Sequence, residues 1–161
     1  MNMTPEQRAT FKTSIVANQQ TGQPLDGVTD EQVIANYYNA ASAFIVWRTL
    51  VAWDTIMTNG MDWTRCDNLS VGKTRIWEWM FRNAQNAIDP SKPNVRAGID
   101  ATWVGTGADL AVRAAVYVHC KRPATRFEQL YVTGTGSDAA PGTMALQGNV
   151  SAQDVSDTLA S

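Results

Sequence analysis

Closely spaced signals for the start and end of helices constrain this chain more than any other feature of its sequence. Two capping-box motifs, Thr4-Pro5-Glu6-Gln7 and Thr29-Asp30-Glu31-Gln32, each precede apolar residues at helical spacing. The first predicts a helix over 5–19, and a turn-forming stretch at 21–27 follows it. The second predicts a helix whose apolar face is formed by Val33, Ile34, Tyr37, Tyr38 and Ala41.

The second half of the chain repeats this pattern. Ser70 begins a predicted helix whose apolar face reaches Ala87, and the prolines at 90 and 93 stop it. Further helices are predicted over 93–104, 106–120 and 125–131. In the helix over 106–120, which Thr106 and Asp109 would cap, we expect the following residues to face inward: Leu110, Ala114, Tyr117 and Val118.

The stretch 43–60 does not decide between strand and helix. Its apolar run, Phe44-Ile45-Val46-Trp47, suits a strand or a buried helix, because so short a run has no diagnostic period. Thr49 would then cap a helix over 50–58, and Asn59-Gly60 would end it.

The whole pattern predicts a mainly α fold. Residues 1–132 would form a bundle of five or six helices, and residues 133–161 an extended C-terminal arm with a short strand and a terminal helix.

The segment 133–161 offers few apolar side chains for burial. A Gly-, Thr-, Ser- and Ala-rich stretch leads to one strand-like run, 144–146, and then to a Ser-capped acidic helix. Terminal segments of this composition fray unless something holds them. We therefore expect neighbouring subunits of an assembly to hold the arm through its apolar side chains: Met144, Leu146, Val150 and Val155.

Charge is distributed unevenly along the chain. Residues 1–64 carry three basic and six acidic side chains, residues 65–126 ten basic and five acidic, and residues 127–161 four acidic and no basic. The basic middle and the acidic tail can pair within one chain, pair between neighbours in a ring, or remain solvated faces.

The densest basic group lies near residue 120. It consists of Arg113, Lys121, Arg122 and Arg126, with His119 among them. Such a group can contact DNA phosphates without reading sequence, can pair with a neighbour's acidic tail, or can be an ordinary solvated face.

No pattern points to catalysis, a cofactor or a metal. Gly72-Lys73-Thr74 matches the end of a phosphate-binding loop, but the first glycine of that motif would fall at Asp67. The glycines of 133–137 lack the third glycine of a dinucleotide loop. The single histidine and two distant cysteines, Cys66 and Cys120, make a poor metal or nucleophile set. We expect a non-enzymatic protein without catalytic, metal-binding or cofactor-binding residues.

Two further features bear on location and interaction. The chain has no apolar run long enough to span a membrane and a polar N-terminal stretch, so we expect synthesis in a cytoplasm and no membrane partner. Trp77 and Trp79 are two apart on one helix and cannot share a face. One should be buried, while the other is exposed or meets a partner.

Several blocks resemble small virion proteins of tailed bacteriophages. One is Lys-Arg-x-Ala-Thr-Arg-x-Glu-x-Leu at 121–130, followed by Thr-Gly-Thr-Gly-Ser at 133–137 and the strand-to-helix step at 148–155. The others are Tyr37-Tyr38-Asn39 with Phe44-x-Val46-Trp47-Arg48-Thr49, and Asn94-Val95-Arg96-x-Gly98. The resemblance covers about residues 30–155, and little matches over 50–70.

The resemblance implies a head-tail connector (adaptor) subunit in the neck of the virion. Such subunits form a dodecameric ring at the portal vertex, contact the portal protein and a tail or stopper protein, and surround the passing double-stranded DNA.

Two other classes of function stay open. The chain could be a capsid decoration, minor head or tail completion protein of a phage, which the mass and symmetry of its oligomer would show. It could also be a small nucleic-acid-binding or enzymatic helper, which a salt-dependent DNA affinity would show. The net charge of −2 argues against DNA binding by the free protein.

Overall fold

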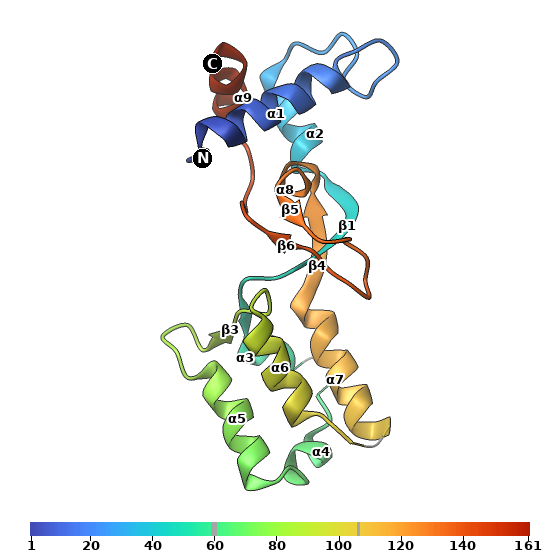
Figure 1. The fold of residues 1–161 in the computed structure, drawn as a ribbon, viewed down its shortest axis with the longest axis vertical. Coiled ribbons are helices and arrows are strands. Elements are labelled where there is room, and N and C mark those ends of the chain that lie inside the picture. The colour runs from blue at the N-terminus through green and yellow to red at the C-terminus, as the bar shows by residue number, and fades with distance from the viewer. Residues whose placement is uncertain (59–60, 106) are drawn as a thin grey trace. The chain divides into compact units, whose positions relative to one another are not determined.

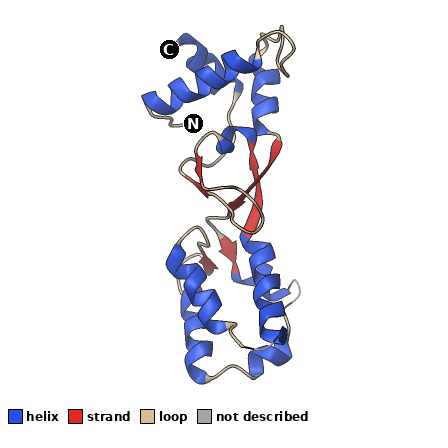
Figure 2. Ribbon diagram, turned by 45° about the vertical axis from the view of Figure 1, so that its right-hand side comes forward, coloured by secondary structure: helices blue, strands red, loops and turns tan. Residues whose placement is uncertain are grey.

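The computed structural model describes residues 1–58, 61–105 and 107–161 (Figures 1 and 2). Within these residues the chain forms nine helices and three two-stranded sheets, so the prediction of a mainly helical fold is confirmed. The elements in chain order are α1 (Pro5–Asn18), α2 (Glu31–Asn39), β1 (Ala41–Trp47), β2 (Val51–Ala52), α3 (Trp53–Thr58), α4 (Trp63–Asp67), α5 (Val71–Phe81), β3 (Ala87–Ile88), α6 (Pro93–Thr102), α7 (Gly107–Cys120), β4 (Lys121–Thr125), α8 (Arg126–Gln129), β5 (Val132–Thr133), β6 (Thr143–Met144) and α9 (Ala152–Ala160).

The chain divides into two compact units. Unit 1 contains Met1–Val46 and Pro123–Ser161, and unit 2 contains Trp47–Arg122. The chain therefore passes from unit 1 to unit 2 along β1 and returns along β4, and these two strands pair in one sheet. Residues 133–161, expected as a separate arm, lie within unit 1, and all six tryptophans lie in unit 2. None of the helices described is long and apolar enough to cross a membrane.

The core of unit 1 joins both ends of the chain. Thr4 forms the predicted capping box with Gln7 at the start of α1, whereas Asp30, not Thr29, caps α2. Phe11 of α1 then packs edge-to-face on Tyr38 of α2 at 4.9 Å and on Phe127 of α8 at 5.0 Å between ring centroids.

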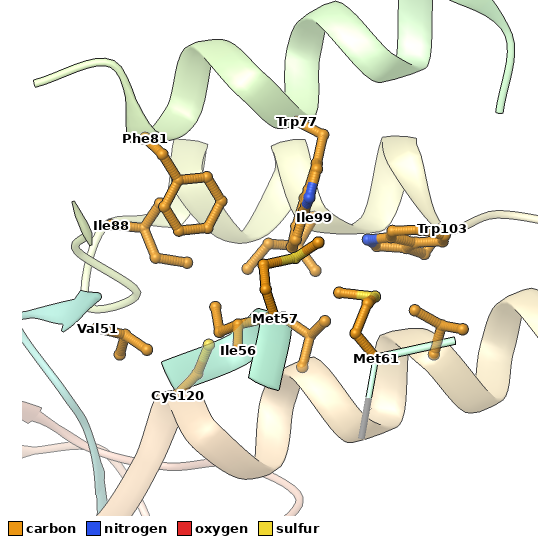
Figure 3. Close-up of a cluster of buried hydrophobic side chains, with 12 residues drawn as sticks. Val51, Ile56, Met57, Met61, Trp77, Phe81, Ile88, Ile99, Trp103 and Cys120 are labelled. Carbon is orange, nitrogen blue, oxygen red and sulfur yellow. The ribbon is translucent and has the colours of Figure 1, made fainter. Parts of the chain in front are cut away.

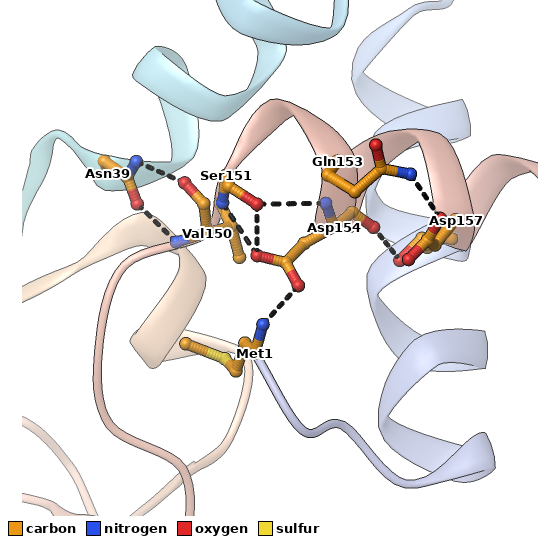
Figure 4. Close-up of polar contacts among 8 residues, drawn as sticks. Met1, Asn39, Val150, Ser151, Gln153, Asp154 and Asp157 are labelled. Atoms are coloured by element: carbon orange, nitrogen blue, oxygen red, sulfur yellow. Dashed lines mark hydrogen bonds and ion pairs between the residues drawn. The ribbon is translucent and has the colours of Figure 1, made fainter.

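The expectation that residues 133–161 bury too little to fold back on their own chain is wrong. Helix α9 packs against α1 and α2, and Val150 and Val155 are buried in the same cluster as Phe11. Asn39 fixes the approach to α9, because its side-chain amide donates to Val150 O (2.8 Å) and accepts from Val150 N (2.9 Å) (Figure 4). The segment 150–155 contains only two valines, which are too few to indicate from the sequence that both are buried in one core.

The glycine-rich stretch at 133–137 is a packed loop. Gly136 O accepts from Ile45 N (2.7 Å), and Gly142 N donates to Ile45 O (2.9 Å), so this loop lies along β1. Gly136 has a φ of 67°, and a Cβ there would lie 2.2 Å from the ring of Phe44. Glycine is therefore required by both conformation and space.

The core of unit 2 lies among α5, α6 and α7 and is rich in tryptophan (Figure 3). Trp77 contacts Phe81 at 5.2 Å and Trp103 at 5.5 Å, both edge-to-face. Ser70 caps α5 as predicted, but the helix ends at Phe81 and not at Ala87. The reason is Asn83, whose side chain bonds Ala87 O and the amides of Gln85 and Ala87 and so builds a turn.

Two other predictions for this region are wrong. The segment expected as one helix over 50–58 begins as strand β2, which pairs antiparallel with β3 (Val51↔Ile88), and only 53–58 are helical. In α7 the buried residues are Val112, Val116 and Cys120, while the following residues expected inside are exposed: Leu110, Ala114 and Val118. The apolar residues of α7 are spread over most faces of the helix. Their spacing in the sequence therefore did not show which face is buried.

The predicted ends of two helices fall on Asn59, Gly60 and Thr106, which lie outside the described residues. Asp109, expected to cap α7 with Thr106, forms an ion pair with Arg65 of α4 (2.6 Å).

Candidate functional site

The sequence motifs that suggest chemistry have structural roles. Gly72-Lys73-Thr74 forms the first turns of α5, after α4 and not after a strand. Lys73 donates its backbone N–H to Ser70 and its ammonium to Val104 O (3.2 Å). In the part of the chain described, no three His, Cys, Asp or Glu side chains gather closely enough to hold a metal ion.

The two cysteines are poorly suited to nucleophilic chemistry. Burial raises the pKa of Cys120 to about 12, although Lys121 and Arg48 act in the opposite direction. Burial also raises the pKa of Cys66, with Asp62 and Asp67 adding to the effect. Both groups are thiols at neutral pH, whereas reactive cysteines are thiolates.

The structure divides the four predicted basic residues between the two units. Arg113, Lys121 and Arg122 belong to unit 2, and Arg126 belongs to unit 1. Arg113 lies 3.6 Å from Asp100 in a largely exposed pair, which contributes about 1 kcal/mol or less. Lys121 and Arg122 are half-buried in β4.

Arg126 is a half-buried cation at the start of α8. Its guanidinium lies 4.3 Å from the centre of the Tyr37 ring, and Nη1 donates to Tyr37 O (3.0 Å). No carboxylate among the described residues lies within 4 Å of it. Glu128, the nearest acid in sequence, is buried and accepts hydrogen bonds from Thr125 N and Gly148 N.

A polar pocket of about 520 Å³ adjoins Arg126, and all of its lining residues lie in unit 1. Ser14 and Asn18 come from α1, and Tyr37 and Tyr38 from α2. Their side chains are already joined: Ser14 Oγ lies 2.7 Å from Tyr38 OH, which accepts from Asn18 Nδ2, while Asn18 Oδ1 accepts from Tyr37 OH (3.2 Å). The pocket thus has fixed polar walls and one positively charged edge.

Helix α5 presents a second candidate surface in unit 2. Trp77 is 3 % exposed and Trp79 is 63 % exposed, which confirms that the two face opposite ways. Arg75 and Arg82 lie one turn before and after Trp79, and neither has an ion-pair partner within the described residues. Beside them is an open groove of about 670 Å³, lined in part by Trp53 and Phe81. We call Arg75, Trp79 and Arg82 the α5 face.

The four candidate arm residues have different environments. Val150 and Val155 are buried within their own chain and are not available to a neighbour. Leu146 is half-buried against the core of unit 1, and Met144 is half-buried in β6, which pairs with β5.

Sequence analysis missed the pocket beside Arg126. Ser14, Asn18 and Tyr37 are ordinary polar and aromatic residues in the sequence, and only the packing of α1, α2 and α8 brings them together. The signal visible in the sequence is the arginine itself, whose only acidic neighbour in sequence is Glu128.

Comparison with protein-family models, curated proteins and solved structures finds no match to this chain.

Proposed function

We propose that this chain is a head-tail connector (adaptor) subunit of a tailed bacteriophage. In this proposal it is a non-enzymatic virion protein, made in the host cytoplasm, that forms a dodecameric ring in the neck between the portal protein and a tail or stopper protein. The specific role comes from the resemblance of the sequence blocks described above.

The α5 face is the observation that carries a role in assembly. Trp79 is exposed between Arg75 and Arg82, and tryptophan and arginine are both residue types enriched at binding hot spots. The groove at the end of α5 gives such a surface a concave edge. We propose that a second copy of this chain covers the α5 face.

Charge supports a second copy as the occupant. The α5 face carries Arg75 and Arg82, whereas residues 127–161 have no basic side chain and expose two acids, Asp138 and Asp157. A ring requires a head-to-tail contact between two different patches of each subunit, and patches of opposite charge satisfy that requirement. The half-buried bases Arg113, Lys121 and Arg122 are candidates for non-specific contact with passing DNA.

The test is the oligomeric state of the full chain and of two matched variants. Native mass spectrometry and electron microscopy should show a closed ring for the unmodified protein. Trp79→Ala should weaken each contact by about 2 kcal/mol or more, which is roughly thirtyfold, and leave helical content unchanged. Trp63→Ala removes a comparably exposed tryptophan of α4 and should assemble normally.

Two results would overturn the proposal. A chain that stays monomeric or trimeric at all concentrations would favour a decoration protein instead. A Trp79→Ala variant that assembles as well as Trp63→Ala would remove the α5 face from the interface.

A further inference from the structure

Arg126 is a positive charge of unit 1 that has no carboxylate partner among the described residues. Arg126 is half-buried, and among the described residues the only hydrogen bond of its guanidinium goes to Tyr37 O, while its backbone N–H donates to Ala40 O. Guanidinium carries several N–H donors in a planar fork that matches the two oxygens of a carboxylate. The guanidinium carbon lies over the Tyr37 ring, and Arg126 lines the 520 Å³ pocket. A partly desolvated cation with donors to spare is suited to bind an anion from outside the subunit.

Asp157 is one of several acidic side chains of unit 1 that have no cationic partner among the described residues. Asp157 is exposed in the last turn of α9, and its carboxylate accepts from Gln153 Nε2 (2.7 Å) (Figure 4). The last turn of α9 contains no basic residue, and no cation among the described residues lies within 4 Å of Asp157. An acid at this end of a helix is unfavourably placed, because the macrodipole is negative there.

Both groups belong to one compact unit, so their separation within a copy is fixed by its fold. They do not meet in that copy. We infer that the pocket beside Arg126 binds a carboxylate and that the occupant is Asp157 of a second copy of this chain. This inference rests on the proposed function, because it requires copies to be neighbours.

The contact has the geometry that a closed ring needs. Arg126 and Asp157 come from different elements, α8 and α9, so each copy offers one group to the copy before it and the other to the copy after it. The proposed contact also assigns the charge complementarity between the basic middle and the acidic tail of the sequence to two residues, Arg126 and Asp157. Ser14, Asn18 and Tyr38 bond one another in the pocket wall, so the guanidinium of Arg126 is the group that a bound carboxylate would meet.

A charge-exchange experiment on the full chain tests the pairing. Arg126→Glu and Asp157→Arg should each raise the protein concentration needed for half-assembly at least tenfold in low salt. The double variant, which restores opposite charges in exchanged positions, should recover most of the loss. The effect should shrink in high salt, because the pair lies at a partly exposed site.

Two control variants have the same charge change away from the pair. Arg8→Glu alters an arginine of α1 that lines a different pocket, and Asp138→Arg alters an exposed acid of the same acidic segment. Both should assemble like the unmodified protein. If Asp138→Arg rescues Arg126→Glu and Asp157→Arg does not, the assignment of Asp157 is wrong.

The experiment still tests the inference if Arg126→Glu disturbs folding, because Asp157→Arg tests it alone. Asp157→Arg is at an exposed position and places a base where the helix dipole favours one, so its monomer should remain folded by far-UV circular dichroism. If this variant assembles at the same concentration as the unmodified protein, the inference fails.

The outcomes also separate this inference from the proposed function. An unmodified chain that forms no ring defeats the proposed function. Rings that form equally well in Asp157→Arg leave that function standing and defeat only the pairing. If Arg126→Gln abolishes low-salt binding of a short DNA duplex and leaves assembly unchanged, the pocket holds phosphate, and the carboxylate assignment is overturned.

Discussion

Truncating Val155 to alanine tests whether α9 folds within its own chain. The Val155 side chain is fully buried against the core shared with Phe11 and Ile34. Val155→Ala removes two methyl groups, each of which contributes about 0.8 kcal/mol by burial. The cavity left behind costs about 1 kcal/mol more, and the better helix propensity of alanine returns about 0.5 kcal/mol. The free energy of unfolding should therefore fall by about 2 kcal/mol.

Urea unfolding followed by far-UV circular dichroism measures this change. The matched control is Val33→Ala, the same substitution at a 47 % exposed position of α2, which should change stability by about 0.5 kcal/mol or less. Both variants should be measured at two protein concentrations tenfold apart. A Val155→Ala loss no larger than that of the control would refute the packing argument. A loss that grows on dilution would show that α9 is exchanged between copies.

Three further predictions concern single groups. Burial would raise the pKa of Asp154, but hydrogen bonds from the Met1 amino group and from the N–H and hydroxyl of Ser151 lower it (Figure 4). Such a carboxylate stabilises the fold above its unfolded pKa of about 3.9, and that stability is lost as the pH falls through the lower folded pKa. Asp154→Asn should therefore cost about 2 kcal/mol in urea unfolding at pH 7 and much less at pH 3; an equal cost at both would contradict the ion pair. Titration calorimetry with magnesium-ATP should show no binding at Gly72-Lys73-Thr74, and micromolar affinity would contradict the structural role of Lys73. Trp103→Phe should cost less than about 2 kcal/mol in calorimetric unfolding, because it removes a buried indole N–H that has no partner among the described residues; a loss above about 4 kcal/mol would contradict this.

Local signals in the sequence predicted the local structure well. Thr4, Ser70 and Thr125 were each expected to begin a helix, and each caps one, because a cap depends on hydrogen bonds within three or four residues. The opposite exposure of Trp77 and Trp79 was also predictable, since it follows from helix geometry alone.

Features that depend on distant residues were not predictable in this way. Val51 becomes part of a strand because Ile88 pairs with it, and no local pattern indicates that partner. Val155 is buried because α1 and α2 together form a surface for α9, so the composition of the tail alone gave the wrong expectation. The pocket beside Arg126 has the same origin: its walls come from helices that are far apart in sequence.

The insertion of unit 2 between the two halves of unit 1 has a consequence for how the chain folds. Helices α1 and α2 are made first, but their core partners, α8 and α9, follow only after the whole of unit 2 has been synthesised. Closing a loop of that length costs about 4 kcal/mol in chain entropy. Unit 2 is continuous and can fold earlier, and its own ends then meet, because Arg48 N donates to Cys120 O at 2.8 Å. If unit 2 folds first, it closes this loop in advance, so we expect mutations that destabilise the tryptophan-rich core also to slow the formation of unit 1.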